Sequence, residues 1–117
     1  MKTIILITLA CLSLLINSSC QTIQKQAVRG VWLTNVDSEV LNSKENIIEA
    51  VNLLDQLGFN TIFVVVWNKA MTTYPSKIMK EFTGVELDTL FTGRDPLKEL
   101  IEEAHKNNIK VIAWFEF

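Results

Sequence analysis

The stretch Thr61-Ile62-Phe63-Val64-Val65-Val66-Trp67 decides the fold of this 117-residue chain, because it is apolar on both of its faces. An antiparallel strand with one face in water alternates between apolar and polar residues, whereas a strand that is covered on both faces is apolar throughout. The stretch therefore predicts a central strand of a parallel sheet, and Asn60 opens it.

Two amphipathic helices are predicted around this strand. Residues 44–57 carry one apolar stripe, with Ser43 as a candidate N-cap and Gly58 as a candidate left-handed stop. Further along, Asp95-Pro96 predicts the start of a second helix, because aspartate caps a helix well and proline is favoured in its first turn. We expect that helix to end at Asn108.

Strand-like segments also occupy residues 28–36 and 109–117, so strands and helices alternate along the chain. Such alternation predicts an α/β architecture, with parallel strands joined by right-handed crossovers. A nucleotide-binding sheet would need a glycine-rich turn after its first strand, but Asn35-Val36-Asp37-Ser38 follows instead. The sequence thus favours the first βαβαβ portion of a (β/α)8 TIM-type barrel, which we expect to be incomplete because such barrels have about 250 residues. The connection over residues 68–94 is long enough to be functional or to contain short elements of its own.

Residues 1–19 have the composition of a secretory signal peptide. The apolar run Ile4–Ile16 is shorter than the roughly 20 residues of a bilayer-spanning helix. Cys20 follows small polar residues and is similar to the cysteine of a bacterial lipobox, although Asn17 stands where that motif usually has leucine. We expect an exported protein with a lipid anchor at Cys20, or alternatively ordinary signal-peptide cleavage, and a short tether over residues 20–27.

Composition and charge argue against several classes of function. The formal net charge is -2 and the basic residues form no cluster, which argues against a nucleic acid partner. With His105 as its one histidine and no paired cysteines in the expected mature part, the chain has no metal-ligand spacing. A serine or cysteine nucleophile has no evident base partner. We therefore expect neither a metal nor a cofactor.

Three segments of the chain carry a family resemblance: RGVWLTN (Arg29 to Asn35), LGFNTIFVVVW (Leu57 to Trp67) with the later YPSK (Tyr74 to Lys77), and DPLKELIEEAHKNNIKVIAWFEF (Asp95 to Phe117). Together they resemble the glycosyl-hydrolase-like family ten of bacterial exported proteins. Their order and spacing match the first three strands of that family's barrel, and they span the predicted barrel part, residues 28–117. The resemblance implies cleavage of glycosidic bonds in polysaccharides, often by a lipoprotein at the cell envelope. The chain differs from the family pattern at Glu116, where relatives commonly have an asparagine.

Sites of barrel enzymes lie at the C-terminal ends of the strands and in the loops that follow. In this chain those positions hold carboxylates and amides, which bind sugar hydroxyls, and aromatic rings, which stack on pyranose rings. Alternation along the last strand places Glu116 on the face of Ile112 and Trp114. We expect that face to line the barrel mouth, because burying a carboxylate under the outer helices is costly unless it is paired. The predicted substrate-binding residues are Asn35, Asp37, Trp67, Asn68, Tyr74, Trp114 and Glu116.

Structural roles remain as alternatives for several of these side chains. Glu116 is a weak candidate for catalysis and is alternatively a structural carboxylate paired with a basic residue. Tyr74 either stacks on a sugar or anchors the long connection. For Trp67, a role in the site and a role in the core are equally expected. We expect Trp32 to be a packing residue of the barrel or interlayer core.

Three hypotheses about function follow. The first is a glycoside hydrolase that acts on a polysaccharide at the cell envelope, of which this chain is a truncated piece, inactive on its own. Glycosidases usually need two carboxylates, and in barrels of this kind the pair more often comes from later strands than from residues such as Asp37 and Glu116. The second hypothesis is a carbohydrate-binding envelope lipoprotein without catalysis. The third is an inactive gene fragment.

Overall fold

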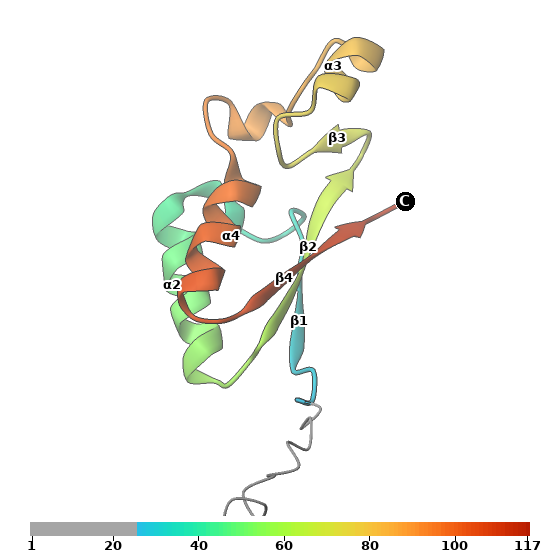
Figure 1. Cartoon of the computed structure of the whole chain (residues 1–117). Coiled ribbons are helices and arrows are strands. Elements are labelled where there is room, and N and C mark those ends of the chain that lie inside the picture. Colours follow the sequence, from blue (N-terminus) through green and yellow to red (C-terminus); the bar gives the residue numbers. More distant parts are fainter. Residues whose placement is uncertain (1–25) are drawn as a thin grey trace, which may run out of the picture.

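A computed structural model describes residues 26–117, which form a four-stranded sheet with helices packed on one face (Figure 1). The strands β1 (Gly30–Leu33), β2 (Thr61–Asn68) and β4 (Lys110–Phe115) are parallel, and β2 lies between the other two. The central place of β2 confirms the prediction from its apolar run, and the parallel βαβαβ arrangement confirms the predicted fold class.

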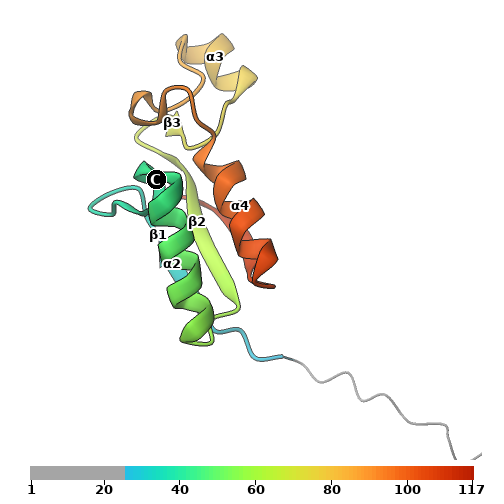
Figure 2. The same ribbon diagram turned by 90° about the vertical axis from the view of Figure 1, so that its left-hand side faces the viewer.

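The two long helices lie side by side against the sheet. They are α2 (Lys44–Gln56), which connects β1 to β2, and α4 (Pro96–Lys106), which leads into β4. Figure 2 shows both helices in front of the sheet when the molecule is viewed from that side. Consecutive parallel strands with their crossover helices on one face are the arrangement of the opening β/α units of a barrel.

Both helices begin and end at the residues that the sequence indicated. The side chains of Ser43 and Asp95 each accept a hydrogen bond from the backbone N–H three residues ahead, both at 3.0 Å. After the helices, Gly58 has a φ of 77° and Asn108 a φ of 55°, so both adopt the left-handed conformation that ends a helix. These local signals fix where the crossovers turn back toward the sheet.

The hydrophobic core lies between the two helices and the sheet. Alternate residues of β2, namely Ile62, Val64 and Val66, point into it and are at most 2% exposed. The remaining buried core residues come from α2 and α4, from a short helix that precedes each of them, and from the residue directly before β4: Leu41, Ile47, Val51, Phe91, Leu100, Ala104 and Ile109.

The opposite face of the sheet is aromatic, and no helix of the described residues covers it (Figure 1). Trp32 of β1 stacks on Phe63 of β2 with ring centroids 4.6 Å apart, and the edge of Trp114 of β4 meets Trp32 at 6.0 Å. Trp32 therefore packs against neighbouring rings, but 61% of its surface remains exposed. Gly30 lies directly beside this layer, where an added Cβ would come within 2.5 Å of the Phe63 ring.

The long connection after β2 contains short elements of its own. Strand β3 (Met71–Thr72) pairs with the end of β2 in an antiparallel direction, which departs from the expectation that all strands are parallel. The reason is a two-residue hairpin at Lys69-Ala70, where both residues have positive φ. The helices α3 (Lys77–Thr83) and η2 (Thr89–Phe91) follow, and the short helix η1 (Val40–Asn42) precedes α2.

The predicted signal peptide of residues 1–19, Cys20 and most of the tether lie outside the described residues. Within residues 26–117, no helix has the length and apolar character that crossing a bilayer requires.

Candidate functional site

Three of the predicted site residues meet where the parallel strands end. Asn35 comes two residues after β1, Asn68 is the last residue of β2, and Glu116 directly follows β4. The Nδ2 group of Asn68 donates hydrogen bonds to Oδ1 of Asn35 at 3.2 Å and to Oε2 of Glu116 at 3.1 Å. We refer to Asn35, Asn68 and Glu116 as the strand-end cluster. It joins residues that are 33 and 48 positions apart in the sequence.

An irregularity in the sheet brings Glu116 to this place. Trp114 lies opposite Val65, but the next residue of β4 lies opposite Trp67, so Val66 is an additional residue on β2. Such a bulge bends its strand and changes the direction of the side chains beyond it. The backbone N–H of Glu116 donates to the carbonyl of Trp67 at 3.0 Å, which aligns Glu116 with the end of β2.

The chemistry of the cluster determines how its two amides are oriented. An ionised carboxylate only accepts hydrogen bonds, so Asn68 must turn its NH2 group toward Glu116. The same NH2 group faces Asn35, which must therefore present its oxygen. As a result, Oδ1 of Asn68 and Nδ2 of Asn35 are not used within the cluster. They provide one acceptor and one donor group for a ligand at the end of the sheet.

The other predicted site residues lie around the cluster or away from it. Trp67 is half-buried beside it and packs against Phe117 with ring centroids 5.4 Å apart. Asp37 lies in the turn after β1 with a φ of 54° and takes no part in the hydrogen bonds of the cluster. Trp114 belongs to the aromatic face of the sheet. Tyr74 is partly buried against the hydrophobic core, which is the position of a residue that anchors the connection.

A comparison with protein families identifies the class to which the chain belongs. The model of the family described as glycosyl hydrolase-like 10 matches residues 27–117, which is nearly all of the described chain. The chain belongs to this family. The match confirms the resemblance that the three sequence segments indicated, and it includes all three residues of the strand-end cluster.

Curated relatives of this glycosyl hydrolase-like 10 chain are named glycosyl hydrolases. It is 30% identical over 113 residues to glycosyl hydrolase DigH of Escherichia coli (strain K12), an alignment that covers 77% of this chain and 24% of the relative. It is 34% identical over 100 residues to glycosyl hydrolase YngK of Bacillus subtilis (strain 168), which covers 75% of this chain and 19% of that relative. The chain thus spans about a quarter or less of the length of these relatives.

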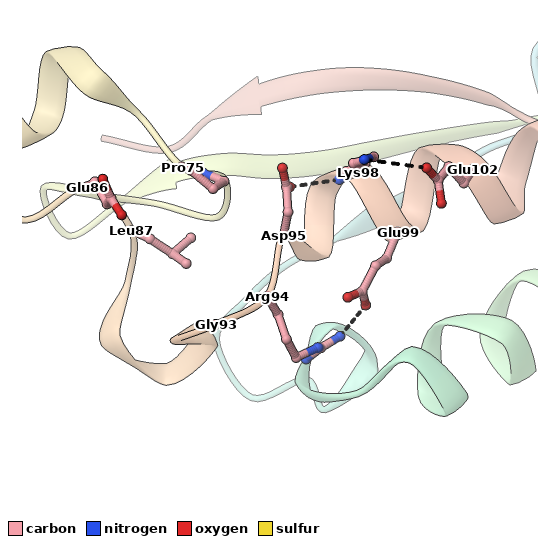
Figure 3. Close-up of a pocket in the computed structure, with 9 residues that line it drawn as sticks. All are labelled: Pro75, Glu86, Leu87, Gly93, Arg94, Asp95, Lys98, Glu99 and Glu102. Carbon is pink, nitrogen blue, oxygen red and sulfur yellow. Dashed lines mark hydrogen bonds and ion pairs between the residues drawn. The ribbon is translucent and has the colours of Figure 1, made fainter.

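The structure also contains a cleft that the sequence did not indicate. It has a volume of about 490 Å3 and lies between the long connection and the start of α4 (Figure 3). Its charged groups bond to one another: Arg94 pairs with Glu99, and Lys98 reaches Glu102 at 4.0 Å. The one sequence feature that could have drawn attention to Arg94 is that it directly precedes Asp95, the N-cap of α4. The residues that line the cleft are Pro75, Glu86, Leu87, Gly93, Arg94, Asp95, Lys98, Glu99 and Glu102.

Arg94 has a structural task within the cleft. Its guanidinium donates to the carbonyl oxygens of Leu41 at 3.1 Å and Asn42 at 2.7 Å, and so joins the start of α4 to η1. The guanidinium of Arg94 is thus used to hold two backbone segments together. In residues 26–117, His, Cys, Asp and Glu side chains form no group of three or more that could hold a metal ion.

Proposed function

We propose that this protein is a glycoside hydrolase that acts on a polysaccharide at the cell envelope, and that the strand-end cluster forms part of its sugar-binding site. The observation that carries the proposal is the meeting of Asn35, Asn68 and Glu116 at the C-terminal ends of three parallel strands. In barrel enzymes this end of the strands carries the active site. Membership of the glycosyl hydrolase-like 10 family supports hydrolysis of a glycosidic bond as the type of reaction.

The groups around the cluster suit a sugar. A carboxylate and two amides offer acceptors and donors to hydroxyl groups, and the half-buried ring of Trp67 offers an apolar surface for the face of a pyranose. Aromatic side chains and a few converging polar groups are what a small-molecule site needs to fix the orientation of its ligand.

Catalysis by a glycosidase usually requires two carboxylates on either side of the scissile bond. The strand-end cluster contains one carboxylate, that of Glu116. We therefore assign Glu116 to substrate contact in the first place and to direct catalysis only in the second. The single carboxylate also supports a second candidate function, namely carbohydrate binding at the envelope without hydrolysis.

A chimeric enzyme tests the proposal. Residues 27–117 would replace the matched segment of E. coli glycosyl hydrolase DigH, and the release of reducing ends would be measured on a panel of polysaccharides. We expect turnover by the chimera and a loss of at least tenfold when Asn35, Asn68 and Glu116 are all changed to alanine, the effect of about 1.4 kcal/mol of lost binding. A folded chimera that binds oligosaccharide without cleaving it would favour the second candidate. Full activity of the triple variant would contradict the placement of the site.

We also propose that the protein is exported and attached to a membrane by lipid on Cys20. The leader-like composition of residues 1–19 and the small residues before Cys20 support this. Metabolic labelling with a radioactive fatty acid in a bacterial host should label the wild-type protein but not the Cys20→Ala variant. Equal labelling of both would contradict the anchor.

A further inference from the structure

We infer that Thr73 is a positioning residue of the strand-end cluster, because it holds the bulge at Val66 and thereby brings Asn68 and Glu116 onto the same face of the sheet. The inference rests on the proposed function, since the cluster is the proposed sugar site. Thr73 is only 1% exposed, so it acts on the cluster through the backbone of β2 and not through contact with a ligand.

Thr73 binds both carbonyl oxygens of the bulge. Its backbone N–H donates to the carbonyl of Val66 at 3.1 Å, and its hydroxyl donates to the carbonyl of Val65, also at 3.1 Å. Val65 and Val66 are each only 2% exposed. A bulge interrupts the hydrogen-bond ladder of a sheet, and a buried carbonyl without a partner is costly. The hydroxyl of Thr73 supplies a donor at the point where the ladder is interrupted.

The bulge decides which side chains of β2 and β4 are neighbours. With the bulge, Phe115 lies opposite Trp67, and the side chains of the next two residues, Asn68 and Glu116, are joined at 3.1 Å. A regular ladder would shift the pairing by one residue and place Glu116 opposite Trp67 instead. Because successive side chains of a strand point to opposite faces, Asn68 and Glu116 would then lie on opposite faces of the sheet. The contact between them therefore depends on the bulge.

The hairpin at the end of β2 delivers Thr73 to this place. On the edge of β2 away from β4, the strand pairs first with β1, as far as Val64, and then with β3 at Trp67 and Asn68. Figure 1 shows β3 folding back along the end of β2. Thr73 directly follows β3, so it lies beside the stretch of β2 where the parallel pairing gives way to the antiparallel one.

Thr72 provides a matched control. It is also buried, at 3% exposed, and its hydroxyl donates to the carbonyls of Tyr74 at 2.8 Å and Glu86 at 3.1 Å. Both acceptors belong to the long connection and not to the bulge. Thr72→Val and Thr73→Val thus each remove one buried hydroxyl from adjacent residues, but only Thr73→Val removes a donor to β2.

Nuclear Overhauser spectroscopy on the labelled protein measures the arrangement directly. In the wild type, the side-chain NH2 group of Asn68 should contact the Cγ protons of Glu116. Thr73→Val should lose this contact, and the backbone N–H of Glu116, which donates to the carbonyl of Trp67, should lose its contacts to the Trp67–Asn68 peptide. Thr72→Val should keep both sets of contacts. Thr73→Ser should also keep them, because it retains the hydroxyl.

The chimera with E. coli glycosyl hydrolase DigH tests the consequence for function. Turnover should fall at least about tenfold in Thr73→Val, which corresponds to about 1.4 kcal/mol, and less than about twofold in Thr72→Val. Thr73→Ser should recover most of the turnover. Urea unfolding should show a similar loss of stability for the two valine variants, because each loses one buried hydrogen bond. A merely structural role of Thr73 would then leave the two variants equally active.

The possible failures are distinguishable. The inference is wrong if Thr73→Val keeps the contact between Asn68 and Glu116, or if Thr72→Val loses it to the same degree. If Thr73→Val does not fold, Thr73→Ser is compared with Thr73→Ala, which differs from it only in the hydroxyl, and equal contacts in both would overturn the inference. If the contact is lost but the chimera keeps full turnover, the register argument holds and the proposed sugar site is wrong.

Discussion

Replacing Gly30 with alanine tests the packing of the aromatic face of the sheet. Two opposing effects decide whether the substitution raises or lowers the free energy of unfolding. Glycine within a strand is usually less stable than alanine by roughly 0.5–1 kcal/mol, so the substitution would ordinarily stabilise the protein. Here the new Cβ would come within 2.5 Å of Cε2 of Phe63. The Phe63 ring would have to move, and it stacks on Trp32 with a centroid distance of 4.6 Å.

The expected net effect is a loss of stability. An aromatic pair contributes roughly 0.5–1.5 kcal/mol beyond burial, and overpacking typically costs about 1–3 kcal/mol. Because Phe63 is only partly buried, its ring can swing aside, and we take the low end of both ranges. After subtracting the gain from replacing glycine, the free energy of unfolding should fall by about 1 kcal/mol.

Urea unfolding followed by circular dichroism measures this change. With a slope of about 1–2 kcal/mol per molar urea, Gly30→Ala should lower the unfolding midpoint by roughly 0.5–1 M. The control is the same substitution in a Phe63→Leu background, where the ring is absent and alanine should be neutral or stabilising. A higher midpoint for Gly30→Ala alone, or the same destabilisation in both backgrounds, would refute the clash.

Three further predictions concern the packing of α4, and each is measured by the same unfolding experiment. Arg94→Ala should lower the free energy of unfolding by about 2 kcal/mol, because two backbone carbonyls and Glu99 lose a charged donor; Arg94→Lys should recover only part of this, and full recovery would count against the bridging geometry. Leu100→Ala should cost about 2–5 kcal/mol, since Leu100 is 0% exposed; a change below 1 kcal/mol would mean that α4 is not packed on the sheet. Asp95→Ala should cost about 1 kcal/mol through loss of the helix cap, and an unchanged midpoint would show that the cap contributes nothing.

Much of the fold follows from local sequence signals. The apolar run of β2 predicted a central strand of a parallel sheet, and β2 lies between β1 and β4. Ser43 and Asp95 cap the helices as expected, and Gly58 and Asn108 end them. These predictions succeed because caps and apolar periodicity act over a few residues.

The hairpin between β2 and β3 could not be predicted in the same way. Two-residue hairpins of this type favour Asn-Gly or similar pairs, because both residues adopt positive φ. Lys69 and Ala70 have φ values of 52° and 58° without such a sequence. Pairing of the neighbouring strand segments, which is not a local signal, holds them there.

The candidate site was partly predictable for a related reason. Residue types at strand ends pointed to Asn35, Asn68 and Glu116, but which side chains meet depends on the register of the sheet. The bulge at Val66 sets that register between β2 and β4, and its sequence gives no sign of it. Tyr74 was also a predicted site residue, but it packs against the hydrophobic core. The sequence alone does not indicate whether a tyrosine in a loop faces a ligand or the core.

The most direct test of a sugar site at the strand ends is a 15N–1H NMR titration of the protein with cellotetraose or mannotetraose. Saturable shifts should appear in the side-chain amide signals of Asn35 and Asn68 and in the indole N–H signal of Trp67. Shifts confined to the cleft around Arg94 and Lys98, or no shifts with either sugar, would contradict a binding site formed by the strand-end cluster.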